Sequence, residues 1–291
     1  MTAGSSQAAL RWLTSWGVVE PLERGLWRLA EPIGRTGEWG VEWVNAFLVA
    51  GERRALLFDS GIGVGPLEAV VALLCDLPLT VVVSHAHWDH AGGARRLAPR
   101  VREVLAHPAD AAALAAGEPG EWLRRALEEE VRRGRLAPED LPGEGHLAPL
   151  AAGAAEEGVL ELGGRRARLL HTPGHTPGSL SLLVEPEGWL FPADLAYRGG
   201  LLWLQEAEAD LDAYARSLDR LRALDGVRAL FGGHDLVAQS PSMLEELRAA
   251  FEQARERAAR GAPEGAAAGQ EGALRVEVGG FGFLMPGGGT G

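Results

Sequence analysis

The stretch "TVVVSHAHWDHAGG", residues 80–93, combines a strand-forming run with a dense cluster of potential metal ligands. Its β-branched valines are typical of a strand that is buried on both faces. The cluster follows directly, with His85, His87, Asp89 and His90 lying within six positions of a chain that has only eight histidines. Imidazole and carboxylate groups are the ligands that zinc prefers at catalytic sites. The stretch therefore predicts a metal site at the end of a buried strand.

The spacing within this cluster indicates two metal ions rather than one. His85 and His87 alternate along extended backbone, so their side chains point the same way. Asp89 and His90 are neighbours at an expected turn into a helix and project differently. The alternative, unrelated polar residues at a strand end, does not explain so dense a cluster. Two ions need further ligands, and the candidates are the histidines of "HTPGHTPGSL" (171–180), Asp194 and His234.

The composition excludes several classes of protein. The formal net charge is −12, and all 28 basic residues are arginine, so the chain lacks the clustered cations that nucleic-acid binders need. Apolar residues make up 46% of the chain, enough for a sizeable core, yet no stretch is long enough to span a bilayer. The N-terminal residues do not follow the pattern of a signal peptide. We therefore expect a soluble, cytoplasmic protein without a membrane partner.

Two parts of the chain repeat one order of expected elements: a β-hairpin ending in an aspartate, a helix, and a strand ending in a histidine. The first copy ends its hairpin at Asp59 and its strand at His85, and the second copy uses Asp194 and His234. Ligand sites in mixed α/β sheets lie at the carboxyl ends of strands. The repeat therefore predicts that the two histidine-ending strands meet at one site.

We expect residues 1–291 to form a single domain with two additions. Residues 106–157 are rich in Ala, Glu and Arg and predict a helical insertion, which is either a lid over the site or a solvated extension. Residues 243–286 predict a C-terminal helix followed by a strand-like tail. Residues 1–21 have the pattern of an amphipathic lead-in.

Four motifs, "HAHWDH", "HTPGHTPGS", "FPAD" and "GGHD", occur in an order that resembles the metallo-β-lactamase superfamily. The resemblance runs from about Gly25 to Asp235. It implies an α/β fold of the αββα four-layer sandwich type, in which two mixed β-sheets lie between layers of helices. It also implies a glyoxalase II-like or lactonase-like branch with a dinuclear site.

The resemblance assigns a role to each ligand candidate. One metal would be held by His85, His87 and His175. The second would be held by Asp89, His90 and His234, with Asp194 bridging the two. His175 is preferred over His171 because the family uses the second histidine of "HTPGH", and Asp59 would orient a ligand through a hydrogen bond.

Two zinc ions, with iron or manganese as alternatives, would hold a bridging hydroxide between them and lower its pKa to near neutrality. The expected function is a metallo-hydrolase that uses this hydroxide on an ester-like bond, in a lactone, ester or thioester of a small molecule. Asp89 would accept or relay a proton. Alternatives within the same fold are a mononuclear iron dioxygenase and a phosphodiesterase. We expect no nucleic-acid partner and allow for a homodimer.

Three aromatic residues are candidates for contact with the substrate. Tyr197 stands three residues after Asp194, where lactonase members of the superfamily place a tyrosine that binds the substrate carbonyl. Its hydroxyl would stabilise an oxyanion, or its ring would only form a wall of the site. Trp39 and Trp43 lie in the loop that flanks the active-site mouth in the family, where they would line a pocket or pack in the core.

Overall fold

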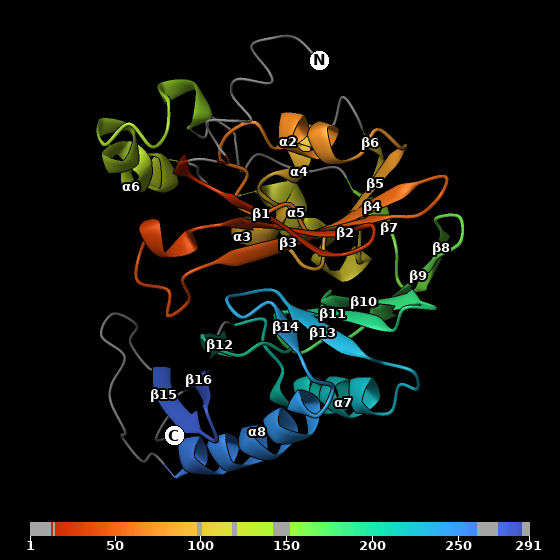
Figure 1. Cartoon of the computed structure of the whole chain (residues 1–291). Helices are drawn as coiled ribbons and strands as arrows, with labels where there is room; N and C mark the ends of the chain where they lie inside the picture. Colours follow the sequence, from red (N-terminus) through yellow and green to blue (C-terminus); the bar gives the residue numbers. More distant parts are fainter. Residues whose placement is uncertain are drawn as a thin grey trace.

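Two β-sheets stacked face to face form the centre of the molecule (Figure 1). The structure is a computed structural model that describes residues 13, 15–97, 101–117, 121–141, 152–205, 207–260 and 273–286. The first sheet has the order β1 to β7, with bounds Val18–Glu23, Leu26–Glu31, Val44–Ala50, Ala55–Phe58, Leu79–Val82, Val101–Ala106 and Gly153–Ala154. The second has the order β14-β13-β11-β10-β9-β8, with bounds Ala238–Gln239, Ala229–Gly232, Trp189–Ala193, Leu180–Glu185, Arg166–His171 and Gly158–Glu161.

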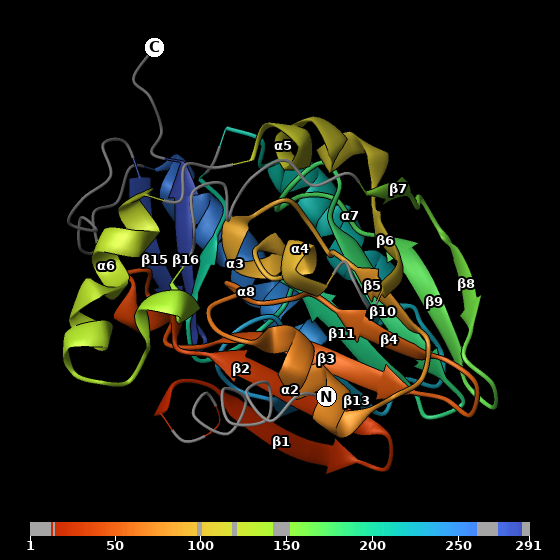
Figure 2. The same ribbon diagram turned by 90° about the horizontal axis from the view of Figure 1, so that it is seen from above.

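Helices cover the outer faces of both sheets, as Figures 1 and 2 show. The helices α2 (Leu67–Leu74) and α4 (Ala94–Leu97) lie on the first sheet, and α7 (Leu211–Arg222) and α8 (Met243–Ala259) lie on the second. This arrangement is the predicted layered α/β fold. The remaining helices are α3 (Trp88–Ala91), α5 (Ala111–Ala116) and α6 (Glu121–Arg132), with short 3-10 turns at Ile33–Arg35, Pro108–Asp110 and Pro138–Asp140.

The apolar runs of the sequence are continuous because both faces of their strands are buried. In β3, Phe47 and Val49 point between the sheets, whereas Ala46 and Leu48 point to the outer layer. The inner layer is rich in phenylalanine: the ring of Phe47 lies 5.0 Å from that of Phe191 and 5.8 Å from that of Phe231. Burying one such ring contributes about 2 kcal/mol, so this layer fixes the stacking of the sheets.

The internal repeat predicted from element order is present. In the first copy β3 and β4 pair antiparallel, α2 follows, and β5 returns parallel to β4. In the second copy β10 and β11 pair antiparallel, α7 follows, and β13 returns parallel to β11. The strands β5 and β13 thus end at equivalent places in the two sheets.

The structure departs from the sequence reading at the N-terminal end of the described chain and adds a pairing at the C-terminal end. Residues 18–21, expected to belong to an amphipathic lead-in, are part of strand β1. The tail pairs as a hairpin of β15 (Ala273–Val278) and β16 (Phe281–Pro286), and β12 (Leu201–Trp203) joins it in parallel to make a third sheet. Strand β12 has three residues and a distant partner, so no local pattern marks it. No helix in the described ranges is long and apolar enough to cross a membrane.

Candidate metal centre

The structure brings all seven predicted ligand residues together where the two sheets meet. His85, His87, Asp89 and His90 follow β5, and the others follow β9, β11 and β13. They form three overlapping groups whose ligand atoms lie within 4.8 Å of one another: His85, His87 and His175; His85, His90 and Asp194; Asp89, His90 and His234. His85 is shared by the first two groups and His90 by the last two. Asp194 faces both ends of the cluster, because its Oδ2 lies 3.7 Å from Nε2 of His175 and 3.1 Å from Nε2 of His234.

The first group is a triangle of imidazole nitrogens. Nδ1 of His87 lies 3.0 Å from Nε2 of His85 and 2.9 Å from Nε2 of His175. The two Nε2 atoms are 3.2 Å apart. His85 and His175 are buried, whereas His87 is half-buried and faces a cavity.

The partners of the opposite ring nitrogens fix the tautomers. Nδ1 of His175 lies 2.8 Å from the carbonyl oxygen of Trp203, and Nδ1 of His234 lies 2.9 Å from that of Trp43. A carbonyl oxygen only accepts hydrogen bonds, so each Nδ1 carries the proton. Nε2 of each ring therefore presents a lone pair to the centre of the cluster.

Asp59 fixes two further rings in the same way. Its Oδ2 accepts from Nδ1 of His90 at 2.8 Å and from the hydroxyl of Ser84 at 2.9 Å. Because that hydroxyl donates to Asp59, it accepts from Nδ1 of His85, 2.9 Å away. Asp59 thus makes the expected hydrogen bond to one ligand candidate, and Ser84 connects it to a second, His85.

The second group contains the carboxylates. Nε2 of His90 and Nε2 of His234 are 3.3 Å apart. Oδ2 of Asp194 lies 3.1 Å from Nε2 of His234, and Oδ1 lies 3.1 Å from Nε2 of His90. Oδ2 of Asp89 lies 3.5 Å from Nε2 of His234. The buried Oδ1 of Asp194 has no hydrogen bond of ordinary geometry among the described residues.

These contacts fit a metal site and fit little else. Lone pairs of nitrogen and carboxylate oxygen that face one another at about 3 Å repel, and a buried group left in that state is costly. A cation among them turns the repulsion into coordination. The outward-facing ring nitrogens are already bound to oxygen acceptors, which is how proteins hold metal-ligating histidines.

The electrostatics differ between the two groups. Burial lowers the pKa of His175 to about 4 and lowers the pKa of His85 well below its usual value. Burial also opposes the charged form of His90, yet the nearby Asp194, Asp89 and Asp59 raise the pKa of His90. Burial likewise opposes the charged form of His234, but the nearby Asp194 outweighs it and raises the pKa of His234. In the first group burial also opposes the charged form of His87, yet Glu208, Asp89 and Asp194 raise its pKa. Burial therefore favours the neutral form of His85 and His175, whereas the nearby carboxylates favour the charged form of His87, His90 and His234.

A cavity of about 380 Å³ opens onto this cluster. Its wall includes His87, Asp89, His175, Asp194 and His234, so five of the predicted ligands face it. Trp39 lines the cavity as predicted. Trp43 is absent from the described lining residues and contributes its backbone carbonyl to His234 instead.

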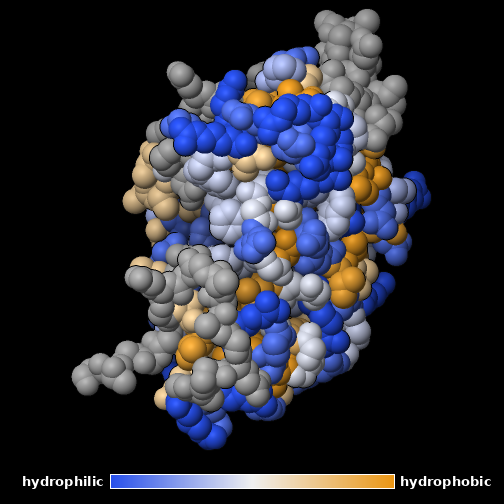
Figure 3. Space-filling view, turned by 90° about the vertical axis from the view of Figure 1, so that its left-hand side faces the viewer, coloured by the Kyte–Doolittle hydropathy of each residue, from blue (hydrophilic) through white to orange (hydrophobic). Residues whose placement is uncertain are grey.

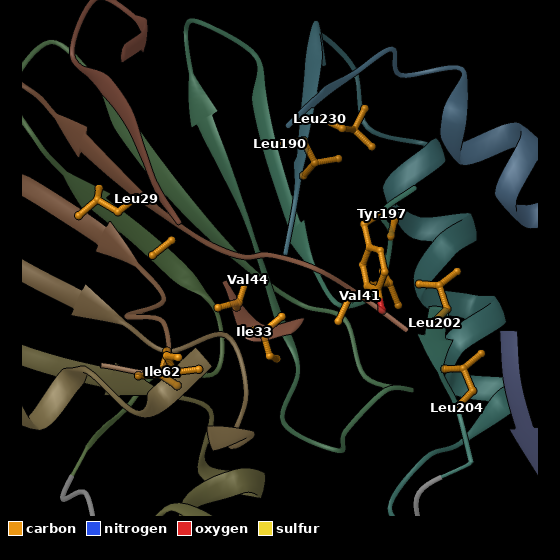
Figure 4. Packing of buried hydrophobic residues seen from close by; sticks show 14 of the residues in the cluster. Leu29, Ile33, Val41, Val44, Ile62, Leu190, Tyr197, Leu202, Leu204 and Leu230 are labelled. Atoms are coloured by element: carbon orange, nitrogen blue, oxygen red, sulfur yellow. The ribbon is translucent and has the colours of Figure 1, made fainter. Parts of the chain in front are cut away.

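Tyr197 lies in the cavity wall, with its ring 5.0 Å from the ring of His234. Figure 4 shows it beside Val41 and Leu202. Its hydroxyl donates to the backbone carbonyl of Leu201 at 2.6 Å. Burial raises the pKa of Tyr197 well above its usual value, so the hydroxyl keeps the proton that it donates. This geometry favours the role of a wall over that of an oxyanion donor.

His171 lies outside the cluster. Its Nε2 lies 2.8 Å from the carbonyl oxygen of Pro177, to which it donates. Its ring stacks on that of His107 with centroids 3.8 Å apart. The choice of His175 rather than His171 as a member of the cluster agrees with these positions.

Sequence reasoning missed three residues near the site. Asp110 is buried and accepts from the backbone N–H of Ala86 at 3.0 Å, the backbone N–H of Gly178 at 2.7 Å and the hydroxyl of Thr176 at 2.9 Å. It thereby ties the loop of His85 to the loop of His175. Its motif, "HPAD", has no periodic or ligand-spacing signal that separates it from an ordinary helix start.

The other two missed residues are Trp122 and Glu208, which both line the cavity. Trp122 belongs to α6, so the insertion over 106–157 forms part of the pocket wall. Oε1 of Glu208 lies 3.6 Å from Nε2 of His87. The part of the insertion at 142–151 lies outside the described residues.

Comparison with known proteins agrees with the fold and the site. A family model described as the metallo-beta-lactamase superfamily matches residues 39–234. Acyl-coenzyme A thioesterase MBLAC2 of Gallus gallus is 30% identical over 227 residues, which cover 72% of this chain and 76% of the relative. A hydroxyacylglutathione hydrolase of Synechococcus sp. is 27% identical over 181 residues, 62% of this chain and 58% of the relative.

Solved structures show the same fold. A metallo-beta-lactamase family protein from Thermus thermophilus superposes with a TM-score of 0.61 at 26% identity, covering 84% of this chain and 85% of the other. A metallo-beta-lactamase from Pontibacter korlensis superposes with a TM-score of 0.59 at 17% identity, covering 81% and 99%. Because the family model spans well over half of the chain, including the strands that carry the histidine cluster, the chain belongs to the metallo-beta-lactamase superfamily of metal-dependent hydrolases.

Proposed function

We propose that this chain hydrolyses an ester or thioester of a small molecule at a centre of two metal ions. The observation that carries the proposal is the chain of three overlapping ligand groups, with Asp194 between His175 and His234 and with lone pairs facing inward. His85, His87 and His175 would hold one ion, and Asp89, His90 and His234 the other, with Asp194 reaching both. Two zinc ions, or iron or manganese, would lower the pKa of a water and polarise the substrate carbonyl.

The protein's own residues would place the substrate and move a proton. The carboxylate of Asp89 lies at the cavity wall, beside His90 and His234, where it can accept a proton from the attacking water. The described lining residues include no serine or cysteine that could serve as a nucleophile. Cys75 lies at the end of α2, away from the cavity lining.

Two features favour an ester or thioester over a phosphodiester. The described lining residues include no arginine, and the chain has no lysine, so neither of the side chains that commonly bind phosphate is available there. Two relatives carry the names acyl-coenzyme A thioesterase and hydroxyacylglutathione hydrolase, and both names denote thioester hydrolysis.

Metal quantification together with a substrate screen tests the proposal. We expect two metal ions per chain and turnover of at least one ester, lactone or thioester, with no turnover of phosphodiesters. Asp194→Ala should lower the metal content and abolish most turnover. A single iron per chain with oxygen consumption, or full metal content and turnover in Asp194→Ala, would contradict the proposal.

A further inference from the structure

Four of the nine tryptophans gather at the cavity: Trp39, Trp88, Trp122 and Trp203, which we call the tryptophan wall. Trp39 is at its centre, with ring centroids 5.7 Å from Trp88, 5.9 Å from Trp122 and 5.9 Å from Trp203. Trp88 and Trp122 meet edge to face at 4.8 Å. All four are half-buried, so the wall is apolar surface that the fold leaves open at the metal centre.

The wall is assembled from distant parts of the chain. Trp88 stands inside the ligand cluster at the start of α3, Trp122 comes from α6 of the insertion, and Trp203 ends β12 of the third sheet. Figure 2 shows α6 at the same end of the molecule as β15 and β16, the sheet to which β12 belongs. Ile33 and Val41 add aliphatic surface to the same cavity. The insertion, through α6, and the third sheet, through β12, therefore both contribute to one apolar pocket.

Hydrogen bonds outside the cavity hold two of the rings in place. The indole N–H of Trp39 donates to the hydroxyl of Thr36 at 2.9 Å, and that of Trp203 donates to the carbonyl oxygen of Trp39 at 2.8 Å. The polar edges of these rings are thus satisfied by the protein, and their faces remain for a ligand. A preorganised aromatic surface binds an apolar group without a large cost in side-chain entropy.

The charges around the cavity favour an uncharged group. Its described lining contains three carboxylates, of Asp89, Asp194 and Glu208, and no arginine. Asp89 and Asp194 belong to the proposed ligand set, but Glu208 does not. Its side chain is 44% exposed near His87, where it would repel a second carboxylate on the substrate. Figure 3 shows this face of the molecule, with a strongly hydrophilic upper part and a paler, mixed surface below it.

We infer that the tryptophan wall binds the acyl group of the substrate, and that this group is apolar, uncharged and longer than acetyl. The inference rests on the proposed function, since it names the acyl side of the bond that the metal centre would cleave. At about 380 Å³ the cavity is near the small end of the range for ligand pockets, which suits an acyl chain rather than a whole large thioester. The thiol or alcohol part would remain outside the wall.

The test uses the metal-loaded protein and thioesters that share one small neutral thiol, N-acetylcysteamine. Acetyl, butanoyl, hexanoyl and succinyl thioesters vary only the acyl group. We expect kcat/KM to rise about fourfold for each methylene buried, the ratio given by the transfer free energy of one CH₂ group. The succinyl thioester, which has the four carbons of butanoyl with a carboxylate in place of the terminal methyl group, should be at least about tenfold poorer than butanoyl.

Two variants assign the effect to the wall. Trp122→Ala should lower kcat/KM for the hexanoyl thioester about tenfold and leave that for the acetyl thioester within about twofold. Trp27→Ala is the matched control, because Trp27 is also half-buried but lies on β2 outside the cavity lining. It should leave the preference for hexanoyl over acetyl unchanged. Equal preferences in the two variants would overturn the inference.

A binding measurement separates this inference from the proposed function. Ketone analogues, in which a methylene replaces the thioester sulfur, cannot be hydrolysed and can be titrated by calorimetry. Tighter binding of the hexanoyl analogue than of the acetyl one, lost in Trp122→Ala, supports the wall even if no thioester is cleaved. Hydrolysis that is indifferent to chain length would sustain the proposed function and reject the wall. Absence of both turnover and chain-dependent binding would reject both.

Discussion

At the scale of single residues, the site depends on protons held on the outer side of each ring. Nδ1 of His90, His175 and His234 faces an oxygen acceptor, and the inner nitrogen is left with a lone pair. The identity of the inner residues was predictable, because ligand residues in a dense cluster carry their own signal. Of the groups that bind the outer ring nitrogens, only Asp59 was predictable. A backbone carbonyl such as that of Trp203 is common to every residue, so no sequence pattern identifies it.

Asp59→Asn should weaken metal binding about 10- to 100-fold. An amide keeps one acceptor oxygen, but its NH₂ group replaces an acceptor that now serves Ser84 or His90. The dissociation constant for zinc, measured by competition with a chromophoric chelator, checks this. Asp76→Asn, at an exposed aspartate, is the control and should leave zinc affinity unchanged. Equal affinities in the two variants would refute the role of Asp59.

Tyr197→Phe tests the two roles that the sequence left open for this side chain. Because the hydroxyl is bound to Leu201, we expect turnover to fall less than tenfold and the free energy of unfolding to fall by about 1 kcal/mol. Steady-state kinetics and urea unfolding give the two quantities. A loss of turnover of tenfold or more at unchanged KM would instead make the hydroxyl an oxyanion donor.

At the scale of elements, buried carboxylates join segments that do not adjoin in the sequence. Asp110, beside α5, connects the two ligand loops. Glu31, at the end of β2, accepts from the indole of Trp16 and from the backbone N–H groups of Gly63 and Val64, in the loop after Asp59. The strands and helices could be predicted from apolar periodicity. The contacts of Asp110 and Glu31 could not, because each depends on partners that only folding brings together.

Asp110→Asn should lower zinc affinity about tenfold, because one of its two acceptor oxygens becomes a donor that faces other donors. Ala86 and Thr176, its partners, flank His85 and His175, so the loss should reach the first ion. Chelator competition measures the affinity, and the d–d spectrum of a cobalt-substituted sample reports any change in ligand geometry. Asp225→Asn, at an exposed position, serves as the control. An unchanged affinity and spectrum would show that the bridge only stabilises the fold.

Glu31 should make stability depend on pH. Burial raises its pKa from 4.5 to about 7 in the folded chain. Between these values the unfolded chain releases the proton and the folded chain retains it, so stability is highest below about pH 4.5 and falls as the pH rises toward 7. Between pH 4.5 and 7 the free energy of unfolding should fall by about 3 kcal/mol. The Glu31→Gln variant, whose side chain does not titrate, should not show this fall. Urea unfolding of both proteins across this range measures it, and parallel curves would disprove the assignment.

At the scale of the whole molecule, the two repeated halves bring their ligands to a common edge. The stacking of two mixed sheets was predictable from the four motifs and from continuous apolar strands. The third sheet was not, because β12 is short and pairs with the far end of the chain. Nor was the participation of α6 in the pocket, since Trp122 has the helical context of an ordinary surface residue.

Removal of the metal should destabilise the entire fold rather than the site alone. Ions that bind only the folded chain stabilise it by about 4 kcal/mol at a concentration 1,000 times their dissociation constant. We therefore expect a strong chelator to lower the melting temperature by several degrees, and zinc to restore it. Calorimetry of the treated and reloaded protein measures the shift. A melting temperature indifferent to chelation would contradict a resident metal centre.

The division of the ligand set between the two halves has a consequence for chains that are incompletely folded. Neither half carries a complete coordination shell: one offers His85, His87, Asp89 and His90, and the other offers His175, Asp194 and His234. A chain whose sheets have not docked would hold only fragments of the proposed shell. On the proposed function it would lack the centre that attacks an ester, so a half-formed molecule would be inert toward its substrate rather than wrongly active.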